Sequence, residues 1–218
     1  PGGAPARAEM LRLVREGIAT NPHYRKITPM VADELARWGD WRNAVWIWES
    51  VLASRPNVVG IMTNVSRGYS ELGEPQRAME WLARARLLQP KAPPVRSLEV
   101  VLLSRAGQLG EALAAAEKSL DEGIFDRDLV NAAFVLAWRA GNHALALRAM
   151  EIKLAQWPDE RLASYLQLGR FYEEALGDES QALQAFGKSV ALAAPQQRAW
   201  VREQVPPRYW ERLGLQPP

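Results

Sequence analysis

The chain has 218 residues, with 27 lysines and arginines against 25 aspartates and glutamates, and it has no cysteine. A net charge of +2 is too small to predict nucleic-acid binding through bulk electrostatics. The lack of cysteine excludes disulfides, thiolate metal sites and a thiol nucleophile.

The first twenty residues predict a helix that covers one end of the domain. Residues 6–19 have the amphipathic pattern of such a helix, and we interpret 1–20 as an N-terminal capping segment. The chain starts Pro1-Gly2-Gly3 without a methionine or a signal-peptide pattern, so we expect a piece of a longer protein. Its apolar stretches all fall short of the roughly 20 residues that a membrane-spanning helix needs.

Residues 21–195 contain a repeat. Five glycines are spaced 34, 34, 34 and 36 residues apart, namely Gly39, Gly73, Gly107, Gly141 and Gly177. An alanine follows each glycine by five residues: Ala44, Ala78, Ala112, Ala146 and Ala182. A fixed period of this length indicates helix-turn-helix units that bury their apolar faces by stacking on one another. The sequence thus predicts five helical units in a single domain over 1–218.

The first unit illustrates the expected elements. A helix is predicted from Thr28 to Trp38, because a hydroxyl residue followed by proline is a typical helix start. The turn at Gly39 leads to a second helix over 41–54. We expect alanine five residues after the glycine because a larger side chain at the closest crossing would separate the two helices.

Tryptophan is concentrated in the same unit, as Trp38, Trp41, Trp46 and Trp48. Helical spacing cannot place all four on one buried face. At least one of them is therefore expected to be exposed or to be covered by the N-terminal helix.

Two later units depart from the pattern. The third has Gly123-Ile124 near the position at which the first, second and fourth units have proline, and glycine is an alternative helix terminator. The fifth has two extra residues before Gly177, which predicts a longer first helix or a bulged turn. Residues 196–218 follow the array and are interpreted as a C-terminal capping helix and tail.

These features resemble the tetratricopeptide repeat. The fifth unit carries the pattern most clearly, in Leu168, Gly169, Tyr172, Gly177, Ala182, Phe186 and Pro195. The resemblance implies an all-α, right-handed α-solenoid whose five units cover roughly 21–195. It also implies a non-catalytic interaction domain or scaffold in which the first helix of each unit lines a concave groove for a peptide or protein.

The groove positions implied by this resemblance combine apolar and cationic residues. They are Asn64, Arg67, Val101, Arg105, Asn131, Val135, Trp138 and Arg139. Arginine binds carboxylate or phosphate with paired hydrogen bonds, and tryptophan offers a flat stacking surface. The set suits a ligand with an anion beside an apolar or sugar face. The alternative is that the arginines are solvated or paired and that Trp138 belongs to the core.

A weaker resemblance concerns residues 21–26, 39–44, 46–50 and 128–133. These segments look like the soluble C-terminal region of bacterial membrane-bound O-antigen ligases and polymerases, a group that includes O-oligosaccharyltransferases. This resemblance implies an accessory domain for glycan assembly, tethered to a membrane protein on the periplasmic side of a Gram-negative inner membrane. Its partner would be a lipid-linked glycan or an acceptor. Without it, a cytoplasmic location is expected.

No residue pattern indicates an enzyme in this chain. The two histidines, His23 and His143, are isolated in sequence, and no pairing of a nucleophile with a base is evident. No glycine-rich phosphate loop follows a strand pattern. We therefore expect no catalytic residues, no cofactor and no metal, and we expect no nucleic-acid partner.

Overall fold

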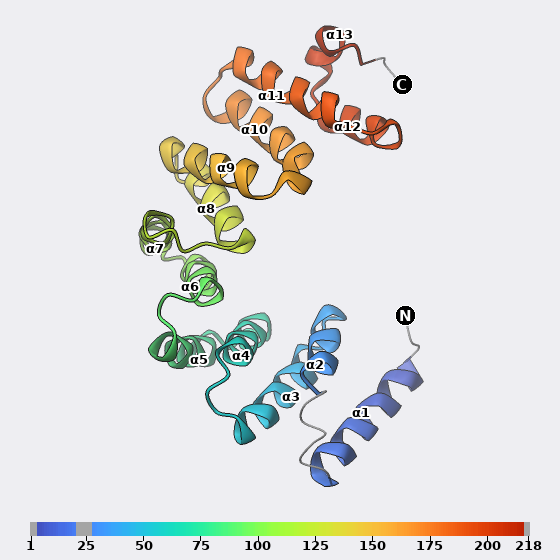
Figure 1. The fold of residues 1–218 in the computed structure, drawn as a ribbon, viewed down its shortest axis with the longest axis vertical. Helices are drawn as coiled ribbons and strands as arrows, with labels where there is room; N and C mark the ends of the chain where they lie inside the picture. The colour runs from blue at the N-terminus through green and yellow to red at the C-terminus, as the bar shows by residue number, and fades with distance from the viewer. Residues whose placement is uncertain (1–3, 21–27, 216–218) are drawn as a thin grey trace. The chain divides into compact units, whose positions relative to one another are not determined.

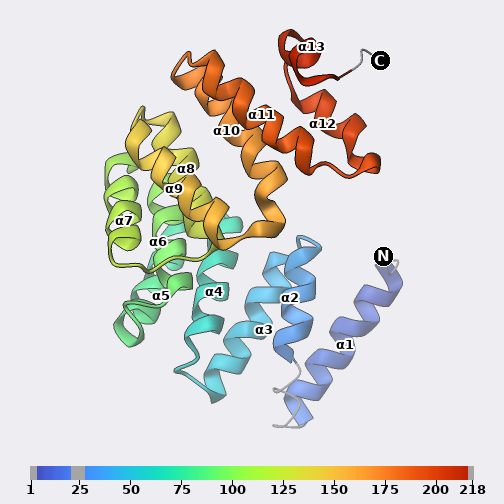
Figure 2. The same ribbon diagram turned by 45° about the horizontal axis from the view of Figure 1, so that its top comes forward.

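The computed structural model describes residues 4–20 and 28–215. Within these ranges it contains thirteen α-helices and no strand (Figures 1 and 2). The chain divides into two compact units, Pro1–Gly107 and Gln108–Pro218, called unit 1 and unit 2. A single domain over 1–218 stays a prediction, and His23 lies outside the described residues.

Unit 1 contains the first six helices. They are α1 (Ala4–Thr20), α2 (Thr28–Arg37), α3 (Trp41–Ser54), α4 (Val59–Glu71), α5 (Pro75–Leu88) and α6 (Pro93–Arg105). Helices α2 and α3 pack as one pair and α4 and α5 as the next, as both views show. The helices predicted over 28–38 and 41–54 agree with α2 and α3 to within one residue.

Helix α1 contributes to the core of unit 1 through Val14, which is only 2% exposed. Its Arg15 lies over the ring of Trp46, with the guanidinium carbon 5.4 Å from the ring centroid. Trp46 is still 38% exposed, as is Trp38, whereas Trp48 is buried. The four tryptophans therefore do not share one buried face, and the N-terminal helix covers part of one of them.

Unit 2 contains the remaining helices. They are α7 (Leu109–Asp121), α8 (Arg127–Arg139), α9 (His143–Gln156), α10 (Arg161–Ala175), α11 (Glu179–Leu192), α12 (Arg198–Gln204) and α13 (Trp210–Leu213). Helices α8 and α9 form one pair, and α10 and α11 another. The two extra residues of the fifth repeat lie in α10, which has 15 residues against 13 in α8.

The turns explain the glycine period. All five glycines have positive φ angles, from 62° at Gly177 to 79° at Gly39, and Gly123 at the end of α7 has a φ of 69°. No atom lies within 4 Å of a Cβ built at the five turn glycines, so the requirement for glycine is one of backbone conformation and not of space. Asp40, Asn142 and Asp178 then cap the second helices by accepting a backbone N–H hydrogen bond.

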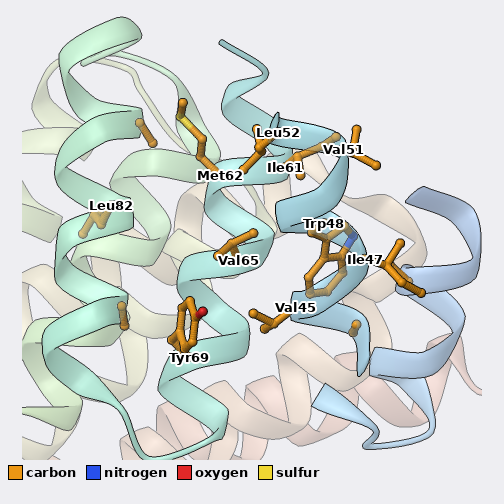
Figure 3. Packing of buried hydrophobic residues seen from close by; sticks show 14 of the residues in the cluster. Val45, Ile47, Trp48, Val51, Leu52, Ile61, Met62, Val65, Tyr69 and Leu82 are labelled. Carbon is orange, nitrogen blue, oxygen red and sulfur yellow. The ribbon is translucent and has the colours of Figure 1, made fainter. Parts of the chain in front are cut away.

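The alanines of the repeat are part of the core, as the close helix crossing predicts. All five alanines of the repeat are 0% exposed. The residues nine positions after each turn glycine are buried as well: Trp48, Leu82, Ala116, Met150 and Phe186. Figure 3 shows the part of this core in unit 1, where Val65 of α4 points toward α3. A Cβ built at Gly68 would collide with Val45, which shows how closely α3 and α4 approach.

Tyr69 is held by two charged neighbours. Its hydroxyl donates a hydrogen bond to Oε1 of Glu49 at 2.6 Å, and it accepts one from the guanidinium of Arg77. That guanidinium also covers the ring, with its carbon 3.9 Å from the ring centroid. Burial, followed by the hydrogen bond to Glu49, raises the pKa of Tyr69. The folded protein therefore favours the neutral phenol.

Replacing Tyr69 with phenylalanine is expected to reduce the loss of stability at alkaline pH. The pKa of Tyr69 is raised above its unfolded value, so its contribution is fully present below about pH 10 and is lost as the pH rises through the folded pKa. In that window one such group changes the free energy of unfolding by about 1.4 kcal/mol per pH unit. Urea unfolding of both proteins at about pH 8 and about pH 11 measures the difference in slope. Equal slopes would contradict the prediction.

Candidate binding surfaces

The eight candidate groove residues divide between the two units. Asn64 and Arg67 lie on α4, and Val101 and Arg105 lie on α6, all in unit 1. The other four lie on α8 in unit 2: Asn131, Val135, Trp138 and Arg139. The structure thus defines one candidate surface within each unit.

In unit 1, Asn64 and Arg67 line a pocket of about 450 Å³ formed by α2, α3 and α4. We call it the Asn64 pocket; its lining is Asp33, Ala36, Arg37, Trp41, Trp48, Asn64 and Arg67. Its volume is in the range of small-ligand sites, roughly 300–1,000 Å³. Two guanidinium groups and one carboxylate line it, and the guanidinium of Arg37 is paired with Glu34 at 2.7 Å.

Asp33 is the polar centre of the Asn64 pocket. Its Oδ1 accepts a hydrogen bond from Nε1 of Trp48 at 3.1 Å and another from Nδ2 of Asn64 at 3.3 Å. These bonds join α2 to α3 and to α4. They also fix the Asn64 amide, whose carbonyl oxygen is directed away from the shared carboxylate.

Sequence reasoning missed the two tryptophans that line this pocket. Trp48 is only 2% exposed, but its indole reaches the pocket wall. The signal that could have indicated this was its N–H group, because a buried indole needs a hydrogen-bond acceptor. Asp33, 15 residues earlier, is that acceptor.

Arg105 is paired. Its Nη1 donates to Oγ of Ser70 at 2.9 Å and its Nη2 donates to Oε1 of Glu71 at 2.6 Å. Both partners lie about one repeat earlier in the sequence, at the end of α4. Val101, one helical turn before Arg105, is half-buried. In unit 1 the arrangement at Arg105 thus agrees with the alternative in which an arginine is paired.

In unit 2, three candidate residues share one face of α8. Asn131, Val135 and Trp138 are spaced i, i+4 and i+7, and this face with the adjacent Arg139 is here called the α8 surface. Val135 is 41% exposed and Arg139 is also exposed, whereas Asn131 and Trp138 are half-buried. Within the described part of the chain, no hydrogen bond or ion pair engages the Arg139 side chain.

Trp138 has features of both alternatives predicted for it, the exposed groove residue and the core residue. One side packs edge-on against Phe134 and Phe171, both with ring centroids 5.6 Å from its own. His143 packs against Phe171 as well, at 5.8 Å, which gives this histidine a packing role. Trp138 is therefore anchored by an aromatic cluster while part of its indole remains on the surface.

The corresponding face of α10 is covered by the C-terminal segment. Arg170 donates to the backbone oxygen and to Oε1 of Gln204, at 3.3 and 2.8 Å. Glu173 binds Arg208, and Tyr209 packs on Phe186 at 5.3 Å. Like the partners of Arg105, Gln204 lies one repeat away from the arginine that it binds. These contacts put the end of α12 where a further first helix would bind, and the capping role of 196–218 stays a prediction.

No protein-family model matches this chain, and no curated protein matches it. Several solved structures are similar to it. PilW, a widely conserved type IV pilus biogenesis factor, is 19% identical with a TM-score of 0.64, over 87% of this chain and 86% of its own. A tetratricopeptide repeat protein from Parabacteroides merdae is 16% identical with a TM-score of 0.61, over 94% and 84%. TTC0263, a thermophilic tetratricopeptide repeat protein in Thermus thermophilus, is 18% identical with a TM-score of 0.60, over 88% and 100%.

The chain has the tetratricopeptide-repeat fold. This confirms the all-α solenoid class that the glycine period predicts. The tetratricopeptide-repeat fold also accounts for the buried alanines and for contacts spaced by about one repeat. Identities below 20% show the fold alone, and the resemblance to O-antigen ligases stays a prediction.

None of the helices in 4–20 and 28–215 combines the length and apolar character needed to cross a membrane. In the same ranges, no three histidine, aspartate or glutamate side chains are grouped so that they could hold a metal ion.

Proposed function

We propose that this chain is a non-catalytic interaction domain that binds a peptide, or an exposed segment of a partner protein, on its first helices. The observation that carries the proposal is the Asn64 pocket, which combines indole surface with two guanidinium groups around one fixed carboxylate. The tetratricopeptide-repeat fold supports it only by analogy, because one fold serves many functions.

The lining of the Asn64 pocket suits a segment that carries a carboxylate next to an apolar side chain. The guanidinium groups of Arg67 and of Arg37, which also pairs with Glu34, are the charged donors in the lining, and Trp41 provides an apolar wall. The carbonyl oxygen of Asn64 can accept a hydrogen bond from a bound backbone N–H, because its amide nitrogen is already used by Asp33.

The α8 surface is proposed as a contact surface of unit 2. Val135 and the exposed part of Trp138 provide apolar area, and Arg139 provides a charged donor beside them. Exposed aromatic and arginine side chains are enriched at protein interfaces. The proposal for unit 2 thus rests on the same chemistry as that for unit 1.

Replacing both Asn64 and Arg67 with alanine is expected to weaken peptide binding by about ten-fold or more, since one charge-assisted hydrogen bond alone contributes about that much. The ligands are peptides selected on the wild-type protein from a displayed library of short random sequences. Fluorescence anisotropy with labelled copies of the selected peptides gives the affinities.

Arg42→Ala is the matched control, because Arg42 is an exposed arginine on α3 outside the pocket lining. It is expected to bind the selected peptides as the wild type does, and circular dichroism checks that all variants remain folded. A parallel double variant, Trp138→Ala with Arg139→Ala, tests the α8 surface. If neither double variant weakens any selected peptide, the proposed surfaces are wrong.

A further inference from the structure

A second pocket in unit 1 lies against the second helices of the repeats, α3 and α5. It has a volume of about 510 Å³, and we call it the Trp81 pocket. Its lining is Glu49, Leu52, Ala53, Pro56, Asn57, Met62, Trp81, Arg84, Leu87 and Leu88. It shares no lining residue with the Asn64 pocket.

The floor of the Trp81 pocket is apolar. Leu52 and Met62 are each 5% exposed, and Figure 3 shows them close together at one end of the core cluster. Trp81 is half-buried beside them. On the rim, Leu87 is 85% exposed and Leu88 is 45% exposed. Two consecutive exposed leucines next to an apolar floor are typical of an interaction site, because a soluble protein rarely exposes such an area without use.

Arg84 gives this pocket an uncompensated positive charge. Its guanidinium carbon lies over the Trp81 ring, 4.6 Å from the ring centroid. Within the described ranges of the chain, the Arg84 side chain forms no ion pair or hydrogen bond. A guanidinium group can bind a carboxylate through two parallel hydrogen bonds.

The one carboxylate in the lining is engaged elsewhere. Glu49 accepts the hydrogen bond from Tyr69, and its Oε1 lies 3.8 Å from Nη2 of Arg77. Arg77 also pairs with Glu74 at 3.0 Å, so it is shared between two carboxylates, and Glu49 forms no ion pair with Arg84. The Trp81 pocket thus has an apolar interior with the guanidinium of Arg84 at its edge.

We infer that the Trp81 pocket binds a short acidic peptide segment of a partner protein. One large apolar side chain of the segment enters between Leu52, Met62 and Trp81, and a neighbouring aspartate or glutamate pairs with Arg84. Charge complementarity selects an acidic segment over a neutral or basic one. Asn57, exposed at the pocket edge, offers its side-chain amide to the peptide backbone. This site is additional to the surfaces proposed on the first helices.

Selecting peptides separately on the wild-type protein and on the Arg84→Glu variant tests the inference. From a displayed library of short random peptides, the wild type is expected to enrich sequences with a large apolar residue next to aspartate or glutamate. The Arg84→Glu variant is expected to enrich lysine or arginine at the same place, because the charge at the pocket edge is reversed. Leu87→Glu, at a position that is 85% exposed, is expected to weaken the binding of the acidic peptides by about ten-fold or more.

Arg42→Glu is the matched control, since it reverses the charge of an exposed arginine on α3 outside the Trp81 pocket and should leave the enriched sequences unchanged. The Asn64→Ala and Arg67→Ala double variant should also keep its affinity for these peptides, which separates this test from that of the proposed function. The inference is overturned if the wild type and Arg84→Glu enrich the same sequences, or if no acidic apolar sequence is enriched. It is also overturned if light scattering shows a dimer that Leu87→Glu dissociates, because the occupant would then be a second copy of the chain.

Discussion

Replacing Phe171 with alanine is expected to lower the free energy of unfolding by about 3–5 kcal/mol. Phe171 is 0% exposed and stands at the centre of the aromatic cluster in unit 2. Its ring centroid lies 5.8 Å from that of Phe134, 5.6 Å from that of Trp138 and 6.1 Å from that of Tyr172. Truncation removes all of these contacts and leaves a cavity where α8, α9 and α10 meet. Urea unfolding followed by far-ultraviolet circular dichroism measures the loss.

Phe171→Leu is the matched control, because leucine keeps most of the apolar volume and a conservative change of this kind costs less than about 1.5 kcal/mol. The alanine variant should also weaken ligand binding at the α8 surface, since Trp138 loses one of the two rings that support it. If alanine and leucine at position 171 gave equal stability, the cluster would not contribute as the geometry indicates.

Replacing Ala146 with leucine is expected to destabilise unit 2 by about 1–3 kcal/mol. Ala146 is 0% exposed in α9, which packs along the whole of α8. A close-packed interior has no room for three more carbon atoms, so the two helices must separate or the new side chain must take a strained rotamer. The thermal unfolding midpoint and the urea midpoint both report this change.

Ala144→Leu provides the comparison in the same helix. Ala144 is exposed and lies only two residues away, so the change in helix propensity is similar while the packing is not affected. Its effect is expected within about 0.5 kcal/mol of zero. Equal destabilisation by the two substitutions would show that helix packing at Ala146 is not the reason for the alanine period.

Much of the fold could be predicted because its determinants recur at a fixed spacing. The glycine at each turn is required by a positive φ angle, and the alanine five residues later by a close helix crossing, so both appear in the sequence once per repeat. Even the irregular fifth repeat was predictable in outline. In the regular fourth repeat, the backbone hydrogen bond that closes the turn joins Asn142 N to Ala137 O, five residues apart. In the fifth repeat, the corresponding bond joins Asp178 N to Tyr172 O, six residues apart.

The pairing of the polar side chains could not be predicted. The helical period places Arg105 and Asn64 on first-helix faces, but it does not determine which neighbour each will reach. Arg105 reaches the end of the preceding first helix, and the amide of Asn64 reaches Asp33. These distances depend on how neighbouring helices are inclined and on side-chain rotamers, and neither is encoded in a spacing rule.

The burial of Lys153 could not be predicted for the same reason. Lys153 is only 5% exposed, and its ammonium group donates to Oε1 of Gln167 at 3.1 Å and lies 3.6 Å from Oε2 of Glu160. The sequence alone gives no sign that this lysine differs from an exposed one. Its partners lie 14 and 7 residues away, on the following first helix and on the turn before it.

The covering of α10 by α12 has a consequence for self-assembly. A repeat that ends in a bare first-helix face offers a surface on which the next copy of the chain could stack head to tail, and such contacts generate open-ended fibres. Here Arg170 and Glu173 already bind Gln204 and Arg208 of the same molecule. A neighbouring molecule would have to displace Gln204 and Arg208 before it could bind Arg170 and Glu173 of α10, so these contacts disfavour head-to-tail stacking at this face.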